Sequence, residues 1–180
     1  MKKFYLIILL AMLYGCGHQE ESETMTELET EEEEFVPVSA DTDELLNKIF
    51  GQGNAAFRGF NLGDNISDVY QKETLTLFEE NEGELAYTYE TDNFQMVDIY
   101  YRYNMEQKLD EIKIDLFLSD DSTAQKTQNA LSTYFTLKYG KEVKAFPKGA
   151  QWNLNSEQSV KIENVSKGLD HGLQIAYFYH

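Results

Sequence analysis

The chain is poor in the residues that build disulfide frameworks, metal centres and nucleic-acid surfaces. One cysteine in 180 residues excludes an intramolecular disulfide and a cysteine-rich metal site. Three histidines are too few for sites that need several imidazoles. Fifteen Lys and Arg against 32 Asp and Glu give a net charge of −17, whereas nucleic-acid binding needs a basic face that releases counterions. We therefore expect no cofactor, no metal and no nucleic-acid partner.

The sequence has no hydrophobic run long enough to span a bilayer, and its longest apolar run lies near the start. The apolar run over residues 4–14 follows Lys2 and Lys3. As a helix it reaches about 16 Å, roughly half of a bilayer core. A short apolar run behind a positive start is typical of a secretory signal peptide. The sequence therefore predicts a signal segment over residues 1–15.

The end of this run has a recognisable pattern. Leu13-Tyr14-Gly15-Cys16 resembles the lipobox of bacterial lipoproteins, in which the Cys becomes the lipidated N-terminus after cleavage. The resemblance implies that Cys16 anchors the protein to a membrane. Gly17 differs from the Asp that retains some lipoproteins in the inner membrane, which favours the outer membrane. The alternative is an ordinary secretory signal with an incidental Cys.

Residues 16–44 are predicted to form a tether between the anchor and a folded domain. Twelve acidic residues and no Lys or Arg fall within residues 17–44. Such a segment repels itself and has too little apolar surface to offset its ordering entropy. The acidic stretch also resembles surface-export signals of some bacterial lipoproteins, but a plain solvated spacer is the favoured interpretation. A single domain is expected over residues 45–180.

Hydrophobic periodicity predicts an α+β domain. A short helix ends at Phe50, a second spans residues 66–72 with Asn65 as its cap, and the longest begins near Ser122 and ends at Gly140. Period-2 alternation predicts six strands, over residues 85–89, 97–103, 112–118, 151–154, 160–165 and 173–179. We therefore expect an antiparallel β-sheet with helices packed on one face, in a tandem α-β-β-β order.

One segment of the domain supports a family resemblance. The stretch over residues 57–65, followed by Val69 and Glu73, resembles the opening of small bacterial envelope lipoproteins. A Tyr-Gly pair ending a helix and Trp152 in a strand add to it. These proteins belong to the β-lactamase-inhibitor-protein-like and BamE (SmpA) fold group. The resemblance implies a role in envelope assembly or in enzyme inhibition.

Few residues are candidates for chemistry. His171 follows Asp170, which would suit an oriented base, but no plausible nucleophile or second imidazole accompanies it. A polar turn is the favoured interpretation. The acidic stretch over residues 79–84 lacks the oxygen and glycine spacing of a calcium loop and is interpreted as a charged hairpin turn.

A binding surface is predicted on the sheet face opposite the core. Phe94, Met96 and Tyr100 share strand parity, and Phe117 lies across from them on the next strand. If exposed, they form an apolar patch suited to a protein partner. The alternative is that the leading helix covers them. We expect a non-enzymatic module that binds another envelope protein, or else a small-ligand or carbohydrate module that uses exposed aromatic residues.

Overall fold

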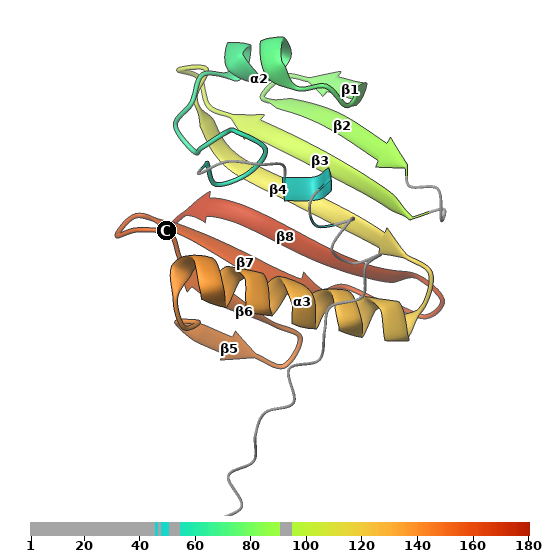
Figure 1. Cartoon of the computed structure of the whole chain (residues 1–180). Helices are drawn as coiled ribbons and strands as arrows, with labels where there is room; N and C mark the ends of the chain where they lie inside the picture. The colour runs from blue at the N-terminus through green and yellow to red at the C-terminus, as the bar shows by residue number, and fades with distance from the viewer. Residues whose placement is uncertain (1–45, 47, 51–54, 91–94) are drawn as a thin grey trace, which may run out of the picture. The chain divides into compact units, whose positions relative to one another are not determined.

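The computed structural model describes residues 46, 48–50, 55–90 and 95–180, all within one compact unit, Val36–His180. Residues 46 and 48–50 are helical. The elements that follow, shown in Figure 1, are α2 (Ile66–Lys72), β1 (Thr76–Asn81), β2 (Glu84–Glu90), β3 (Met96–Tyr103), β4 (Leu109–Leu118), α3 (Asp121–Tyr139), β5 (Lys144–Phe146), β6 (Gly149–Asn153), β7 (Gln158–Asn164) and β8 (His171–Tyr179).

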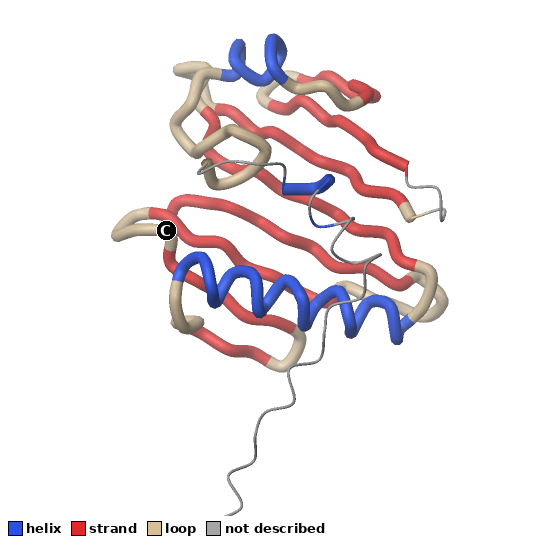
Figure 2. The backbone as a smooth tube through the Cα atoms, viewed as in Figure 1, coloured by secondary structure: helices blue, strands red, loops and turns tan. Residues whose placement is uncertain are grey.

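All eight strands belong to one antiparallel sheet, which dominates the fold in Figure 2. The spatial order is β1-β2-β3-β4-β8-β7-β6-β5, so each half of the sheet follows the chain and the two halves meet between β4 and β8. At this junction Ile114 lies opposite Ile175 and Ile112 lies opposite Tyr177. Because these side chains are fully buried, the two halves share one core.

The core occupies one face of the sheet. Residues that lie opposite one another across the strands form apolar rows, because paired residues project from the same face. One such row crosses six strands and consists of Leu85, Tyr101, Ile112, Tyr177, Val160 and Trp152. All six side chains are buried, which explains the strict alternation of the sequence in these strands.

Aromatic side chains from the covering segments pack onto this face. Phe135 of α3 contacts Trp152 and Tyr177, with ring centroids 5.5 Å and 6.2 Å apart. Phe50 of the leading helical residues contacts Phe135 and also Phe57, each at 5.7 Å. The N-terminal segment and the long helix are therefore joined through one aromatic cluster over the sheet.

The predicted helix ends are largely confirmed. Asn65 caps α2, because its side chain accepts a hydrogen bond from the backbone N–H of Ser67 at 2.9 Å. Gly140 ends α3 with φ of 85°, a conformation that glycine adopts without strain. The start of α3 differs from the prediction: Asp120, rather than Ser122, is the cap and accepts the backbone N–H of Thr123.

The predicted fold class is wrong. The structure is a single eight-stranded antiparallel sheet with few helical residues, in place of a tandem α-β-β-β arrangement with helices packed on one face. Two strands were not predicted: β1 is exposed along its whole length, and β5 has three residues. Neither strand carries the alternating burial that identifies a strand in a sequence. Both are edge strands, where one-sided burial is weakest.

Among the described residues, no helix is long and apolar enough to span a membrane.

Candidate functional site

The sheet face opposite the core carries the predicted binding residues. Met96 of β3 lies directly opposite Phe117 of β4, and their exposed fractions are 39% and 45%. Tyr100 is on the same face and lies opposite Lys113. The structure thus brings Met96 and Phe117 together as a cross-strand pair, with Tyr100 further along β3. Phe94 lies outside the described residues, as does the predicted lipidation site, Cys16.

The leading helical residues do not cover this face. Phe50 is buried against Phe57, Tyr134 and Phe135, on the core side of the sheet. The alternative in which this helix covers Met96 and Phe117 is therefore wrong. An exposed apolar pair on a sheet face is a feature that partner-binding surfaces use.

Two further residues complete this surface, and sequence reasoning missed both as site residues. Phe78 of β1 packs edge-on against Tyr100, with ring centroids 6.3 Å apart, at a bulge in the β1–β2 pairing. The Nζ atom of Lys113 lies 4.0 Å from the centre of the Tyr100 ring, within the range of a cation–π interaction. Phe78 was not recognised because β1 itself was not predicted. We call Phe78, Met96, Tyr100 and Phe117 the open-face patch.

The patch is crossed by a row of polar side chains. Asp98 lies directly opposite Asp115, an arrangement of like charges that costs stability unless each carboxylate has partners. Thr88 Oγ1 donates to Asp98 at 2.8 Å, and Gln174 Nε2 donates to Asp115 at 2.9 Å. Lys113 Nζ lies 3.0 Å from Asp115. These contacts hold both carboxylates in fixed positions on the open face.

The acidic stretch at the start of the sheet forms the charged hairpin that was predicted. β1 and β2 pair through Asn81 and Glu84, and the turn between them contains Gly83 with φ of 84°. Positive φ favours glycine at this position. Among the described residues, no group of three or more His, Cys, Asp or Glu side chains is arranged to hold a metal ion.

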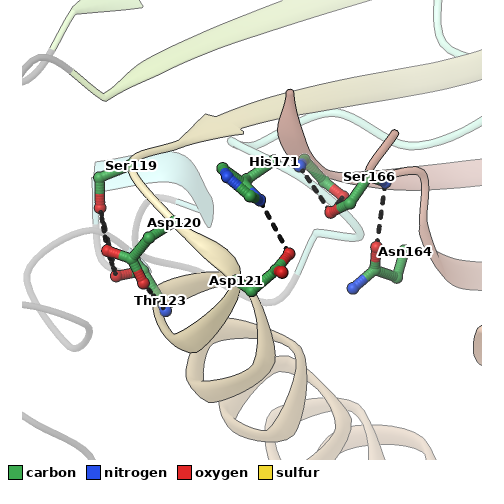
Figure 3. A network of polar contacts seen from close by, with 8 residues as sticks. Ser119, Asp120, Asp121, Thr123, Asn164, Ser166 and His171 are labelled. Atoms are coloured by element: carbon green, nitrogen blue, oxygen red, sulfur yellow. Dashed lines mark hydrogen bonds and ion pairs between the residues drawn. The ribbon is translucent and has the colours of Figure 1, made fainter. Parts of the chain in front are cut away.

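His171 takes part in a polar network at the beginning of α3, shown in Figure 3. Its Nδ1 atom lies 2.8 Å from Oδ1 of Asp121, so its acidic partner comes from the helix and not from the neighbouring Asp170. Ser166, also in this region, accepts a hydrogen bond from the backbone N–H of Gly172 at 3.1 Å. The contact between His171 and Asp121 joins the first turn of α3 to the first residue of β8. The arrangement fits a structural role for His171.

A buried ion pair joins the turn at Arg58 to Glu73 at the end of α2. Arg58 donates to both carboxylate oxygens of Glu73, through Nε at 2.9 Å and Nη2 at 2.8 Å. The Glu73 side chain is 0% exposed, and it also accepts the hydroxyl of Tyr101 at 2.7 Å. The hydrogen bonds and the charge of Arg58 outweigh burial and lower the pKa of Glu73. Burial beside this carboxylate raises the pKa of Tyr101 well above its usual range.

The backbone around Arg58 explains how the pair is positioned. Arg58 and Gly59 both have positive φ, 48° and 87°, within a tight turn closed by mutual hydrogen bonds between Phe57 and Phe60. Both phenylalanines are buried against Tyr101. Arg58 Nη1 also donates to the backbone carbonyl of Lys48 at 2.7 Å. The buried ion pair therefore links the turn at Arg58 to the end of α2 and to Tyr101 of β3.

Comparison with known proteins adds no relatives: no family model, no curated protein and no solved structure matches this chain. The resemblance to envelope lipoproteins stays a prediction.

Proposed function

We propose that this chain is a non-enzymatic lipoprotein of the bacterial envelope that binds another protein through the open face of its sheet. Cys16 would carry the lipid, and the acidic stretch up to residue 44 would separate the lipid from the sheet. The expected location is the outer membrane, with the membrane and a second envelope protein as partners.

The observation that carries this proposal is the exposed cross-strand pair of Met96 and Phe117. Exposed Met and aromatic side chains are enriched at the centres of protein interfaces. Charged side chains elsewhere on the same face are paired: Arg102 bonds both Glu84 and Glu111, and Lys161 lies 3.7 Å from Glu163. Exposed apolar groups that share a face with paired charges are a combination that protein interfaces use.

The lipid anchor is tested by metabolic labelling with a fatty-acid analogue in a bacterial host. The wild-type chain should incorporate the label, and Cys16→Ser should not. Equal labelling of the two chains would remove the anchor from the proposal.

Binding through the open face is tested separately by site-specific photo-crosslinking. A photoreactive amino acid at position 117 should give one discrete crosslinked species in envelope preparations. The control places it at Leu169, which is 92% exposed but lies in the turn before β8. Tyr100→Ala should weaken the crosslink from position 117. Identical crosslinks from both positions would contradict binding through this face.

A further inference from the structure

The charges around the open-face patch are unequal in number. Six carboxylates and two cations project from the open face of β1–β4, since residues paired across strands share a face. The carboxylates belong to Glu79, Glu84, Glu90, Asp98, Glu111 and Asp115, and the cations to Arg102 and Lys113. The half of the sheet that carries the patch, the upper half in Figure 1, therefore has a surplus of negative charge on its open face.

Both cations of this half of the face are engaged by carboxylates beside them. Arg102 bonds Glu84 and Glu111, which lie opposite it on the two neighbouring strands. Lys113 lies 3.0 Å from Asp115 of the same strand. The remaining carboxylates of the open face of β1–β4 therefore have no cation of their own on that face.

Two of these carboxylates stand next to apolar side chains of the patch. Glu90 lies directly opposite Met96, and Glu79 follows Phe78 in β1. Both glutamates are exposed, and neither forms an ion pair among the described residues. Glu79 accepts a hydrogen bond from the side-chain amide of Asn81 at 2.9 Å, which leaves its charge uncompensated. Cations of a partner can therefore reach both carboxylates.

The side chain of Tyr100, within the patch, responds to this surplus. The pKa of Tyr100 is raised above its usual value, first by burial and then by the charges of Asp98, Asp115, Glu84 and Glu79. Four carboxylates of the open face thus act on a single residue of the patch. Apolar groups and negative charge therefore occupy the same part of the surface.

The sign of the surplus distinguishes between possible occupants of this face. A second copy of the chain would bring an equal surplus of negative charge. The stretch over residues 17–44 carries twelve acidic residues and no Lys or Arg, and anionic phospholipid headgroups have the same sign. Like charges that meet across an interface cost affinity, so all three are disfavoured and a positively charged occupant is favoured.

We propose that the open face binds a basic segment of a partner protein, which packs an apolar side chain on Met96 and Phe117 and places Lys or Arg beside Glu79 and Glu90. The inference rests on the function proposed above and adds the charge of the partner. Apolar contacts at the centre of an interface supply most of its affinity, and charges at its rim steer association and select the partner.

Photo-crosslinking from position 117 in envelope preparations, the assay of the proposed function, also tests this inference. Mass spectrometry of the crosslinked species identifies the partner segment that lies on the open face. We expect that segment to have a net positive charge, with Lys or Arg near an apolar residue. The crosslink yield should fall as the salt concentration rises, because salt screens the charges that steer association.

Matched charge variants are then compared with the purified partner. Glu79→Lys combined with Glu90→Lys should raise the Kd about tenfold or more, mainly through slower association. Both positions are exposed, so the fold should not be affected. Glu157→Lys combined with Asp170→Lys makes the same change in net charge in exposed turns, after β6 and before β8. This control should leave the Kd nearly unchanged at about 0.15 M salt, where exposed charges act over roughly 8 Å.

The possible outcomes separate this inference from the proposed function. Absence of a discrete crosslink from position 117 would contradict the proposed function, and the inference with it. A discrete crosslink to a neutral or acidic segment would overturn the inference alone, as would a crosslink between two copies of the chain. A Kd that is unchanged in the Glu79 and Glu90 variant, or raised equally in the control, would show that these carboxylates do not select the partner.

Discussion

Replacement of Arg58 by methionine should destabilise the fold far more than the loss of a surface ion pair. The Glu73 side chain has no solvent exposure and Arg58 has 14%, so the variant leaves a buried carboxylate without its cation. Breaking a buried pair from one side costs about 3–5 kcal/mol. Domains of this size are stable by roughly 5–15 kcal/mol, so the loss is a large fraction of the total.

Urea unfolding followed by circular dichroism measures this effect, and Arg102→Met is the matched control. Arg102 forms two ion pairs, at 2.6 Å to Glu84 and 2.5 Å to Glu111, but its side chain is 42% exposed. Exposed pairs contribute about 0–1 kcal/mol because water screens them. We therefore expect the Arg102 variant to lose much less stability, although its contacts are shorter than those of Arg58.

The pH dependence provides a second check on the same pair. The pKa of Glu73 is lowered in the folded state, so its stabilisation is present above the pKa of an unfolded glutamate, about 4.3. It is lost as the pH falls through the lower folded pKa. In Arg58→Met the carboxyl becomes easier to protonate, so the stability difference between the variant and the wild type should shrink in acid. A loss below about 1 kcal/mol at neutral pH, or a difference that does not shrink in acid, would refute this reasoning.

Three further changes test other parts of the structure. Tyr177→Phe should be neutral or stabilise by up to about 1 kcal/mol in urea unfolding, because the buried Tyr177 hydroxyl has no hydrogen-bond partner among the described residues; a loss of stability would show that it has one. Gly149→Ala should destabilise by about 3 kcal/mol in the same assay, since an added Cβ would lie 1.9 Å from the carbonyl oxygen of Ile162; a normal unfolding midpoint would contradict this. Phe117→Ala should leave the unfolding midpoint nearly unchanged, because its side chain is exposed, yet reduce partner crosslinking from a photoreactive residue at position 96; undiminished crosslinking would argue against the open face.

The interior strands were predictable because burial of one face requires an apolar residue at every second position of the sequence. Ile112, Ile114 and Leu116 alternate with Glu111, Lys113 and Asp115, and the structure buries the first set and leaves the second partly exposed. The edge strands carry no such pattern. In β1, Leu77 and Phe78 are adjacent at a bulge and both are exposed, so alternation fails there.

The overall architecture could not be inferred because it depends on pairings between distant segments. Periodicity identifies β4 and β8 as strands but does not say that they are neighbours, and their pairing is what makes one sheet of two halves. The cap of α3 was misplaced for a related reason. Asp120 and Ser122 are both good capping residues, and only the backbone geometry distinguishes them.

The candidate site was predictable in part. Strand parity placed Met96, Tyr100 and Phe117 on one face, which the structure confirms as a matter of geometry. Their contacts with Phe78 and Lys113 depend on a bulge and on a side-chain orientation that no spacing rule describes. The partner of His171 could not be predicted from the sequence either, since Asp121 lies 50 residues away along the chain.

The central place of β8 sets the order in which the protein can assemble. This strand comes after all the others in the chain, yet it lies between β4 and β7. Until β8 has left the ribosome, β4 and β7 each keep an exposed strand edge, and the core that β8 contributes to is incomplete. Pairing between segments distant in the chain is slow, so the insertion of β8 is expected to be a slow step of folding. A polypeptide truncated before His171 should therefore be an aggregation-prone fragment that needs chaperones, and not a smaller folded domain.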